Sequence, residues 1–168
     1  MIQFIIASVI CLFGYVFHTV THYFEHKGRE INLPHIFFEI VIFAGYAAWF
    51  HMVFSDPFKI EFSHGYYIGM VIGVIGLLMF ILSVISKKGF REEKHLVTKG
   101  IYSKIRNPMY LGTILMHIGF PLVFGSMLTL ASAVLWIPQI FLWRFWEEQD
   151  LEKRFGEEYI RYKKRTLF

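Results

Sequence analysis

Two polar blocks of the sequence combine residue types that bind ionic ligands, and both lie beside long apolar segments. The first, Leu96 to Gly112 (LVTKGIYSKIRNPMYLG), is basic and carries Tyr102 in a Gly-x-Tyr pattern and a second tyrosine in Asn-Pro-x-Tyr-x-Gly. The second, RFWEEQDLEKRFGEEYIRYKKR, begins at Arg144. Basic side chains bind carboxylates, and tyrosine rings can face a cation. We expect the chemistry of the protein to reside in these two blocks.

A third candidate consists of His18, His22 and His26. Their spacing places three imidazoles on one face of a helix. Two such histidines can ligate zinc, copper or haem iron, although a histidine at a membrane edge is also stable without a ligand. A haem- or metal-binding membrane protein is therefore an alternative from a different functional class.

The elements that must hold these residues are membrane-spanning helices. The chain is 55% hydrophobic and 19% aromatic, and residues 2–24, 65–86 and 108–143 contain no Asp, Glu, Lys or Arg. Uncharged apolar runs of about 18 residues or more are typical of transmembrane helices. The first run lacks the basic start and cleavage site of a signal peptide, so we expect it in the mature protein. The only cysteine, Cys11, lies in this run and rules out a disulfide framework within one chain.

The expected fold is an all-α integral membrane protein with about five transmembrane helices and a C-terminal amphipathic helix, forming one domain over residues 1–168. Residues 1–86 form a three-helix anchor, with helices over 2–24, 34–54 and 65–86. Residues 87–168 supply a cofactor-binding loop, a helical hairpin over 109–146 and the amphipathic tail. Each helix of the hairpin, which breaks near Gly125 and Ser126, is short for a full crossing. The tail from Glu147 onward is expected to lie on the membrane or to pack against the loop.

The basic residues predict the orientation. With five crossings, sixteen of the seventeen Lys and Arg residues lie on one side, and only Lys59 lies on the other. The positive-inside rule places the two polar blocks in the cytoplasm, in the inner or plasma membrane if the source is prokaryotic. Basic loops also bind the lipids of the membrane, which accounts for most of the net charge of +4. No nucleic-acid partner is expected.

Two further features within the membrane have competing interpretations. Glu39 lies inside the second helix, where a carboxylate requires a partner such as Arg29 or a function. Glycines recur along the third helix at Gly65, Gly69, Gly73 and Gly76. Such a face lets helices approach closely, so we expect an internal helix contact, with a homodimer contact as the alternative.

The order of the motifs resembles the isoprenylcysteine carboxyl methyltransferase and phospholipid methyltransferase superfamily. The pattern LVTKGIY from Leu96 is followed by RNPMYLG from Arg106, an apolar hairpin, Glu147-Glu148 and FGEEYIRY from Phe155. The match covers about residues 87–165. Each motif alone is weakly specific, whereas their joint order around the hairpin is specific.

The resemblance implies an integral membrane methyltransferase that uses S-adenosylmethionine and has no Rossmann domain, in agreement with the lack of a Gly-x-Gly-x-x-Gly motif. It places the cofactor between the loop before the fourth helix and the segment after the fifth. The cofactor-binding residues implied by the motifs and their chemistry are Lys94, His95, Leu96, Val97, Lys99, Gly100, Tyr102, Asn107, Pro108, Met109, Tyr110, Glu147 and Glu148.

The chain departs from the superfamily at two positions. The superfamily often has Arg-His-Pro where this chain has Arg106-Asn107-Pro108, and asparagine cannot carry a proton as histidine does. An arginine that binds the substrate carboxylate in eukaryotic members aligns with Trp143, and the nearest candidate, Arg144, is one position away. We therefore expect Arg144 and Arg106 as the catalytic residues that would hold a carboxylate acceptor.

Methyl transfer is an in-line displacement that depends mainly on proximity, orientation and exclusion of water. Ring faces of Tyr102 and Tyr110 can contact the sulfonium, and Glu147 can accept protons from the ribose or the amine. The expected acceptor is a lipophilic molecule or lipid that enters from the bilayer. An isoprenylcysteine-like carboxylate is the first expectation, with phospholipid amines and hydrophobic thiols as alternatives. No metal site is assigned in this leading interpretation.

Overall fold

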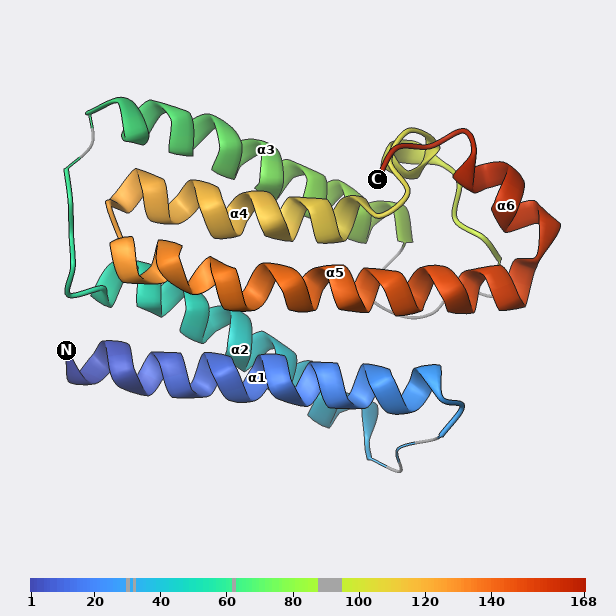
Figure 1. Ribbon diagram of the computed structural model, residues 1–168, viewed down its shortest axis with the longest axis horizontal. Helices are drawn as coiled ribbons and strands as arrows, with labels where there is room; N and C mark the ends of the chain where they lie inside the picture. The colour runs from blue at the N-terminus through green and yellow to red at the C-terminus, as the bar shows by residue number, and fades with distance from the viewer. Residues whose placement is uncertain (30, 32, 62, 88–94) are drawn as a thin grey trace.

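The computed structural model describes residues 1–29, 31, 33–61, 63–87 and 95–168. These residues form the helices shown in Figure 1. In chain order they are α1 (Ile2–His26), α2 (His35–Ser55), α3 (Ser63–Lys87), the 3-10 helix η1 (Gly100–Ser103), α4 (Pro108–Phe124), α5 (Met127–Phe155) and α6 (Glu157–Lys163). The five long helices form a bundle, and α6 turns back at one end of it toward η1 (Figure 1). The expected all-α architecture is confirmed over the described part of the chain.

Four of the helices, α1, α2, α3 and α5, are long and apolar enough to cross a membrane. Helix α4 is apolar but shorter, with 17 residues. Many large apolar side chains point outward from these helices, among them Ile5, Phe43, Val71 and Leu82. An apolar exterior of this extent is stable in lipid because water is absent there. The chain is an integral membrane protein.

The glycine face of α3 packs against α4. A Cβ atom added at Gly69 would lie 2.7 Å from the carbonyl oxygen of Gly119, and one at Gly76 would lie 2.7 Å from that of Gly112. Only glycine allows two helix backbones to approach this closely. The expected internal contact is confirmed for this part of the face. A homodimer contact through the glycine face stays a prediction.

Helix α4 is short, as expected, whereas α5 is longer than its part of the expected hairpin. The chain breaks at Gly125, which has φ +61°, as expected. Helix α5, however, does not end near Trp146 but continues to Phe155 and has 29 residues, so the prediction that it is too short to cross is wrong. The charged pair Glu147-Glu148 marks the end of the apolar run but not the end of the helix, because glutamate is a good helix former. Gly156, with φ +50°, separates α5 from α6.

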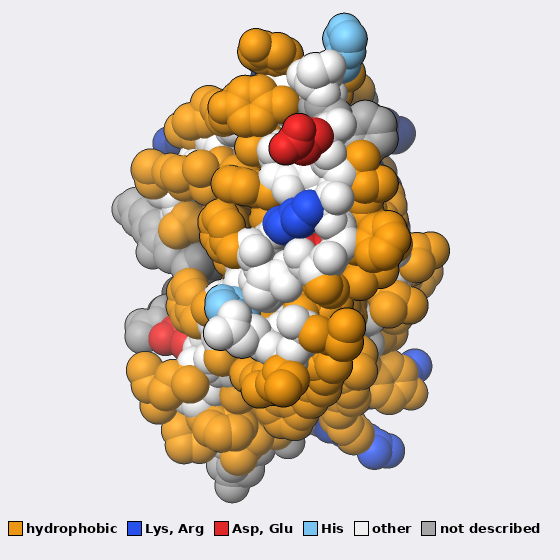
Figure 2. All heavy atoms as spheres, turned by 90° about the vertical axis from the view of Figure 1, so that its left-hand side faces the viewer, with side chains coloured by type: hydrophobic (Ala, Val, Ile, Leu, Met, Phe, Trp, Pro, Cys, Tyr) orange, Lys and Arg blue, Asp and Glu red, His pale blue; other side chains and the backbone are white. Residues whose placement is uncertain are grey.

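The connection between α2 and α3 is fixed to the turn between α4 and α5 by polar contacts. Asp56 Oδ2 accepts hydrogen bonds from the backbone N–H and the hydroxyl of Thr129, at 2.7 and 2.8 Å. Lys59 Nζ donates to Ser126 Oγ at 2.6 Å. Figure 2 views the molecule from this end and shows a small polar area surrounded by apolar side chains. These contacts hold one end of the bundle together, while the polar blocks lie at the other end (Figure 1).

Candidate active site

The two polar blocks meet at one end of the bundle. The C-terminal parts of α3 and α5, the start of α4, η1 and α6 converge there (Figure 1). Sequence segments that are separated by an apolar hairpin therefore form one site, as the motif order predicted. Residue Lys94, expected in this site, lies outside the described residues.

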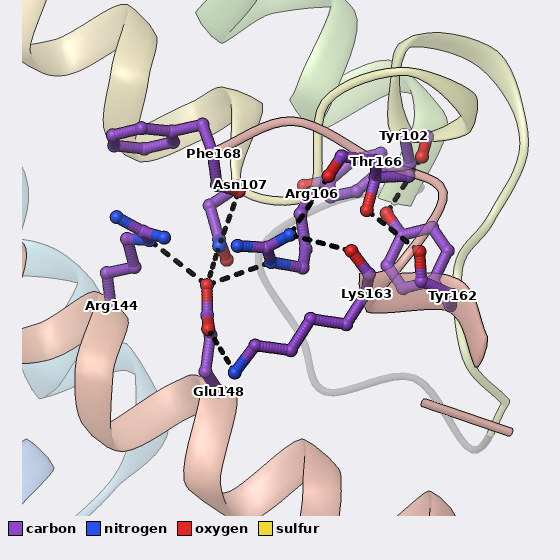
Figure 3. Close-up of polar contacts among 9 residues, drawn as sticks. All are labelled: Tyr102, Arg106, Asn107, Arg144, Glu148, Tyr162, Lys163, Thr166 and Phe168. Atoms are coloured by element: carbon purple, nitrogen blue, oxygen red, sulfur yellow. Dashed lines mark hydrogen bonds and ion pairs between the residues drawn. The ribbon is translucent and has the colours of Figure 1, made fainter. Parts of the chain in front are cut away.

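Glu148 is the centre of the polar network drawn in Figure 3. Its Oε1 atom accepts hydrogen bonds from Asn107 Nδ2 at 2.7 Å, Arg106 Nε at 3.0 Å and Arg144 Nε at 3.1 Å. Its Oε2 atom pairs with Lys163 Nζ at 3.0 Å. The carboxylate is 10% exposed, and its burial is compensated by these donors. Glu148 therefore joins α4, α5 and α6, and both of its oxygens already have protein partners.

Glu147, the neighbouring residue, has different surroundings. Its Oε1 atom accepts a hydrogen bond from Lys87 Nζ of α3 at 3.2 Å, and the Tyr110 hydroxyl also donates to its carboxylate. The side chain is about one quarter exposed, at 27%. A carboxylate with two partners and partial exposure retains room to accept further hydrogen bonds from a ligand.

The loop before α4 contributes a buried tyrosine beside Glu147. Tyr102 is 6% exposed and interacts electrostatically with Lys87 and Glu147. The Tyr162 hydroxyl of α6 donates to the Tyr102 carbonyl oxygen at 2.8 Å (Figure 3). Burial raises the pKa of Tyr162 to about 12, so this hydroxyl remains a donor at neutral pH. Helix α6 thus holds η1 in place.

The other loop residues expected to bind the cofactor line the surface near Tyr102. His95, Lys99 and Gly100 are exposed, and Leu96 and Val97 are half-buried. Gly100 adopts φ +61°, and a Cβ atom there would lie 2.6 Å from Ser86 Oγ. Both observations explain why glycine stands at this position.

The start of α4 is fixed by its own sequence. Pro108 occupies the first turn, where a missing N–H costs little. Asn107, immediately before it, is buried and directs its amide to Glu148 and to the carbonyl oxygen of Phe168. Met109 is half-buried at the same helix end. Asparagine therefore serves here as a neutral donor that orients a carboxylate.

The C-terminal segment of the chain covers the arginine side of the site. Leu167 forms a short parallel bridge with Ile105, in which Arg106 N donates to the Leu167 carbonyl and Leu167 N donates to the Lys104 carbonyl, both at 2.8 Å. The guanidinium of Arg144 lies 4.1 Å from the centre of the Phe168 ring. This arrangement encloses Arg144 between Glu148 and an aromatic ring (Figure 3).

Sequence reasoning missed four residues of this site: Lys87, Tyr162, Lys163 and Phe168. The tail spacing did place Tyr162 on one face of an amphipathic segment, and packing against the loop was one of the two expected arrangements. No local signal in the sequence distinguishes Lys87 or Lys163 from the other basic residues near the membrane edge. Their partners, Glu147 and Glu148, lie 60 and 15 residues away along the chain, and only the tertiary structure pairs them.

The polar and aromatic side chains at this end of the bundle fit S-adenosylmethionine. Glu147 can accept hydrogen bonds, and the ring of Tyr102 is suited to a cation. The Tyr159 hydroxyl is buried without a hydrogen-bond partner among the described residues, and its ring interacts electrostatically with Glu148 and Arg106. A buried hydroxyl without a protein partner can be satisfied by a polar ligand.

The histidines of α1 do not gather into a metal site. The ring of His18 lies 4.3 Å from that of Trp143, that of His22 lies 5.9 Å from that of Trp146, and His26 Nδ1 lies 3.0 Å from Asp150. Within the described part of the chain, no group of three or more His, Cys, Asp or Glu side chains could hold a metal ion. The metal alternative therefore has no set of three ligands among the described residues. Glu39 is exposed on α2, and Arg29, one of the partners considered for it, contacts the Phe24 ring.

The fold and the polar network together define an integral membrane protein with a candidate ligand site at one end of a helical bundle. A family model described as phospholipid methyltransferase matches residues 72–158, just over half of the 168-residue chain. The chain belongs to this family and is a methyltransferase. S-adenosylmethionine is the methyl donor in this family. Neither a curated protein nor a solved structure matches the chain significantly.

Proposed function

We propose that the protein transfers the methyl group of S-adenosylmethionine to the amine head group of a membrane lipid. This choice of acceptor rests on the hydrogen-bond partners of Arg106 and Arg144. Both guanidinium groups donate their Nε–H to the same oxygen of Glu148, at 3.0 and 3.1 Å, so both are directed at a carboxylate of the protein itself. An acceptor carboxylate at a membrane edge would need a cation that is directed at it, whereas an amine would not.

Glu147 and its neighbours supply the cofactor side in this proposal. Glu147 would accept hydrogen bonds from the donor's ribose or amino group, with Lys87 and Tyr110 fixing its orientation. Tyr102 would offer its ring, and exposed Lys99 would meet the donor's carboxylate. When bound, S-adenosylmethionine supplies an activated methyl group on a sulfonium. The chain itself contributes position, orientation and exclusion of water.

The acceptor would reach this end of the bundle from the bilayer. The exposed apolar side chains of α1, α2 and α5 suit the acyl chains of a lipid, and the polar head group would then lie at the depth of Glu147. The basic residues near this end support a cytoplasmic location for the site.

A methyl-transfer assay tests this proposal. The full chain, in nanodiscs with anionic lipid, would receive labelled donor and one acceptor at a time: phosphatidylethanolamine, a prenylcysteine or an alkyl thiol. We expect labelled lipid amine and little labelled carboxylate. Glu147→Ala should abolish transfer, while Glu152→Ala, an exposed glutamate on the same helix, should not. Methylation of the prenylcysteine alone would contradict the choice of acceptor and leave the methyltransferase assignment intact.

A further inference from the structure

The exposed carboxylate of Glu39 lies on an apolar surface of α2. The side chains around it, Ile36, Ile40 and Phe43, are 62%, 59% and 55% exposed and suit contact with lipid. Within the described part of the chain, Glu39 makes no hydrogen bond or ion pair. A carboxylate in such surroundings is costly without a partner. The lipids that surround α2 are the molecules that can supply one.

The depth of Glu39 in the membrane limits which lipid groups can reach it. Helix α2 has 21 residues, or about 32 Å at 1.5 Å per residue, which matches the hydrocarbon thickness of a bilayer. Glu39 follows the first residue of this helix, His35, by four positions, so it lies about 6 Å along the axis from the helix start. Lipid head groups begin at this depth, and their cationic groups are suitable partners for a carboxylate.

The face of α2 that carries Glu39 also carries Tyr46, because seven residues make almost two full turns of a helix. The Tyr46 ring lies 6.3 Å from the Phe80 ring of α3. Tyr46 also interacts electrostatically with Tyr110 at the start of α4, whose hydroxyl donates to the Glu147 carboxylate. Glu39 therefore lies on the face of α2 that is directed toward the candidate active site.

This face is packed against α4 in the half of α2 that is far from the candidate site. The Phe50 ring lies 5.5 Å from that of Phe120, and the Phe54 ring lies 4.8 Å from that of Phe124. Toward its start, α2 runs obliquely away from α4 (Figure 1). The exposure of Phe43 agrees with this divergence. The part of the face that includes Glu39 is therefore accessible from the bilayer.

We infer that Glu39 binds the ammonium group of the acceptor lipid as the lipid approaches along α2, an inference that rests on the function proposed above. A lipid amine has an ordinary pKa near that of lysine, about 10.4, and is therefore cationic at neutral pH. Its N–H groups can donate charge-assisted hydrogen bonds to the carboxylate. The apolar side chains around Glu39 would contact the acyl chains at the same time.

Glu39 and Glu147 have different tasks in this arrangement. Glu147 already has Lys87 and Tyr110 as partners, whereas Glu39 has its full hydrogen-bonding capacity available to a lipid. Between them, the ring of Tyr46 can contact a cation. Glu39 does not touch the reacting atoms and is a specificity-determining residue. Its charge favours an amine acceptor and repels a carboxylate, because like charges disfavour one another in a medium of low dielectric constant.

The test measures how the methylation rate depends on the density of the acceptor in the membrane. The full chain is placed in nanodiscs in which phosphatidylethanolamine is diluted into phosphatidylglycerol, a lipid without an amine. Loss of a hydrogen bond between charged groups costs about tenfold in affinity at the lower end of its range. Glu39→Gln should therefore raise KM, expressed as mole fraction of lipid, about tenfold and leave kcat within about twofold. Glu61→Gln, at an exposed glutamate near the other end of the bundle, should match the wild type.

Two further variants separate charge from shape. Glu39→Asp keeps the carboxylate and should restore KM to within about threefold of the wild type, whereas Glu39→Lys should raise KM above that of Glu39→Gln. Phosphatidylcholine provides a second measurement, because its cationic head group cannot accept a further methyl group. It should inhibit the wild type competitively and inhibit Glu39→Gln more weakly, by about the factor seen in KM.

Calorimetry with S-adenosylhomocysteine distinguishes the possible failures. Unchanged cofactor affinity, together with a rise in KM that follows the charge at position 39, supports the inference. An unchanged KM in both Glu39→Gln and Glu39→Lys overturns it and leaves the proposed function standing. A fall in kcat or in cofactor affinity without a change in KM also overturns it, because that pattern indicates a structural role. A wild type that binds S-adenosylhomocysteine but methylates no lipid amine overturns the proposed function and the inference together.

Discussion

The amide of Asn107 donates to Glu148 Oε1 at 2.7 Å, which fixes the residue before α4 to the C-terminal part of α5. The same oxygen accepts from Arg106 and Arg144. An asparagine at this position donates a hydrogen bond to the carboxylate without adding charge. The two arginines supply the positive charge that a buried anion requires.

We expect Glu148→Gln to destabilise the fold. The variant keeps the shape of the side chain but leaves four donors, three of them cationic, without an anion, so the free energy of unfolding should fall by about 3 kcal/mol. Chemical unfolding in mild detergent measures this change. The matched control is Glu152→Gln, exposed on the same helix, which should change stability by about 0.5 kcal/mol or less. Equal effects of the two substitutions would contradict the central role of Glu148.

Glu147→Ala should weaken cofactor binding with little effect on stability. A hydrogen bond to a charged group contributes about 1.5–3 kcal/mol, or roughly 10- to 150-fold in affinity. Calorimetry with S-adenosylhomocysteine on the folded variant checks this value, with Glu152→Ala as the control. Unchanged affinity would move the cofactor contact to another residue.

Arg106→Ala and Arg144→Ala should differ in their effect on cofactor affinity. Arg106 donates to Glu148 and to the carbonyl oxygens of Lys163 and Thr166, at 3.2 and 3.1 Å. Arg106→Ala should therefore loosen the loop and the C-terminal segment and lower both cofactor affinity and turnover. Arg144 contacts Glu148 and the Phe168 ring, so Arg144→Ala should leave cofactor affinity within about threefold. Selective loss of carboxylate methylation in Arg144→Ala would instead support a prenylcysteine acceptor.

Stability should depend on the ionisation of Tyr162 at high pH. Burial raises its pKa from the ordinary 10.0 to about 12 in the folded protein. The folded state therefore holds this proton more tightly than the unfolded chain. The resulting stability is fully present below pH 10 and is lost as the pH rises toward 12.

Tyr162→Phe tests this relationship. It removes the bond to the Tyr102 carbonyl oxygen and should cost about 0.5–1.5 kcal/mol at neutral pH. The decline between pH 10 and 12 should be smaller in the variant. Thermal unfolding followed by near-ultraviolet circular dichroism measures both effects. Tyr66→Phe, at an exposed tyrosine near the other end of the bundle, is the control, and identical profiles for the two variants would exclude a role for Tyr162.

The two ends of the bundle should lie on opposite sides of the membrane. In a Cys11→Ser background, a cysteine at Lys164 should react with an impermeant maleimide only from the cytoplasmic side, and one at Glu61 only from the outside. Labelling of intact cells and of inverted vesicles reports the two sides. Reaction of both positions from one side would rule out the predicted orientation.

The sequence by itself determined the class of the fold and predicted the location of the candidate site. Uncharged apolar runs long enough for a bilayer leave the backbone few alternatives to a helix, so α1, α2 and α3 were predicted to within about two residues. The ordered motifs also placed Tyr102, Asn107 and Glu147 in one site, because short motifs on either side of a hairpin return to the same membrane face.

The tertiary structure decided which basic side chains pair with each of the two carboxylates. Glu147 and Glu148 are adjacent in the sequence, but one helical step turns their side chains by about 100° and directs them to different elements. Helix α5 also continues beyond the charged pair to Phe155, whereas the end of the apolar run predicted an end near Trp146. The partners of a buried charge lie far away along the chain, and their identity depends on packing that no local pattern contains.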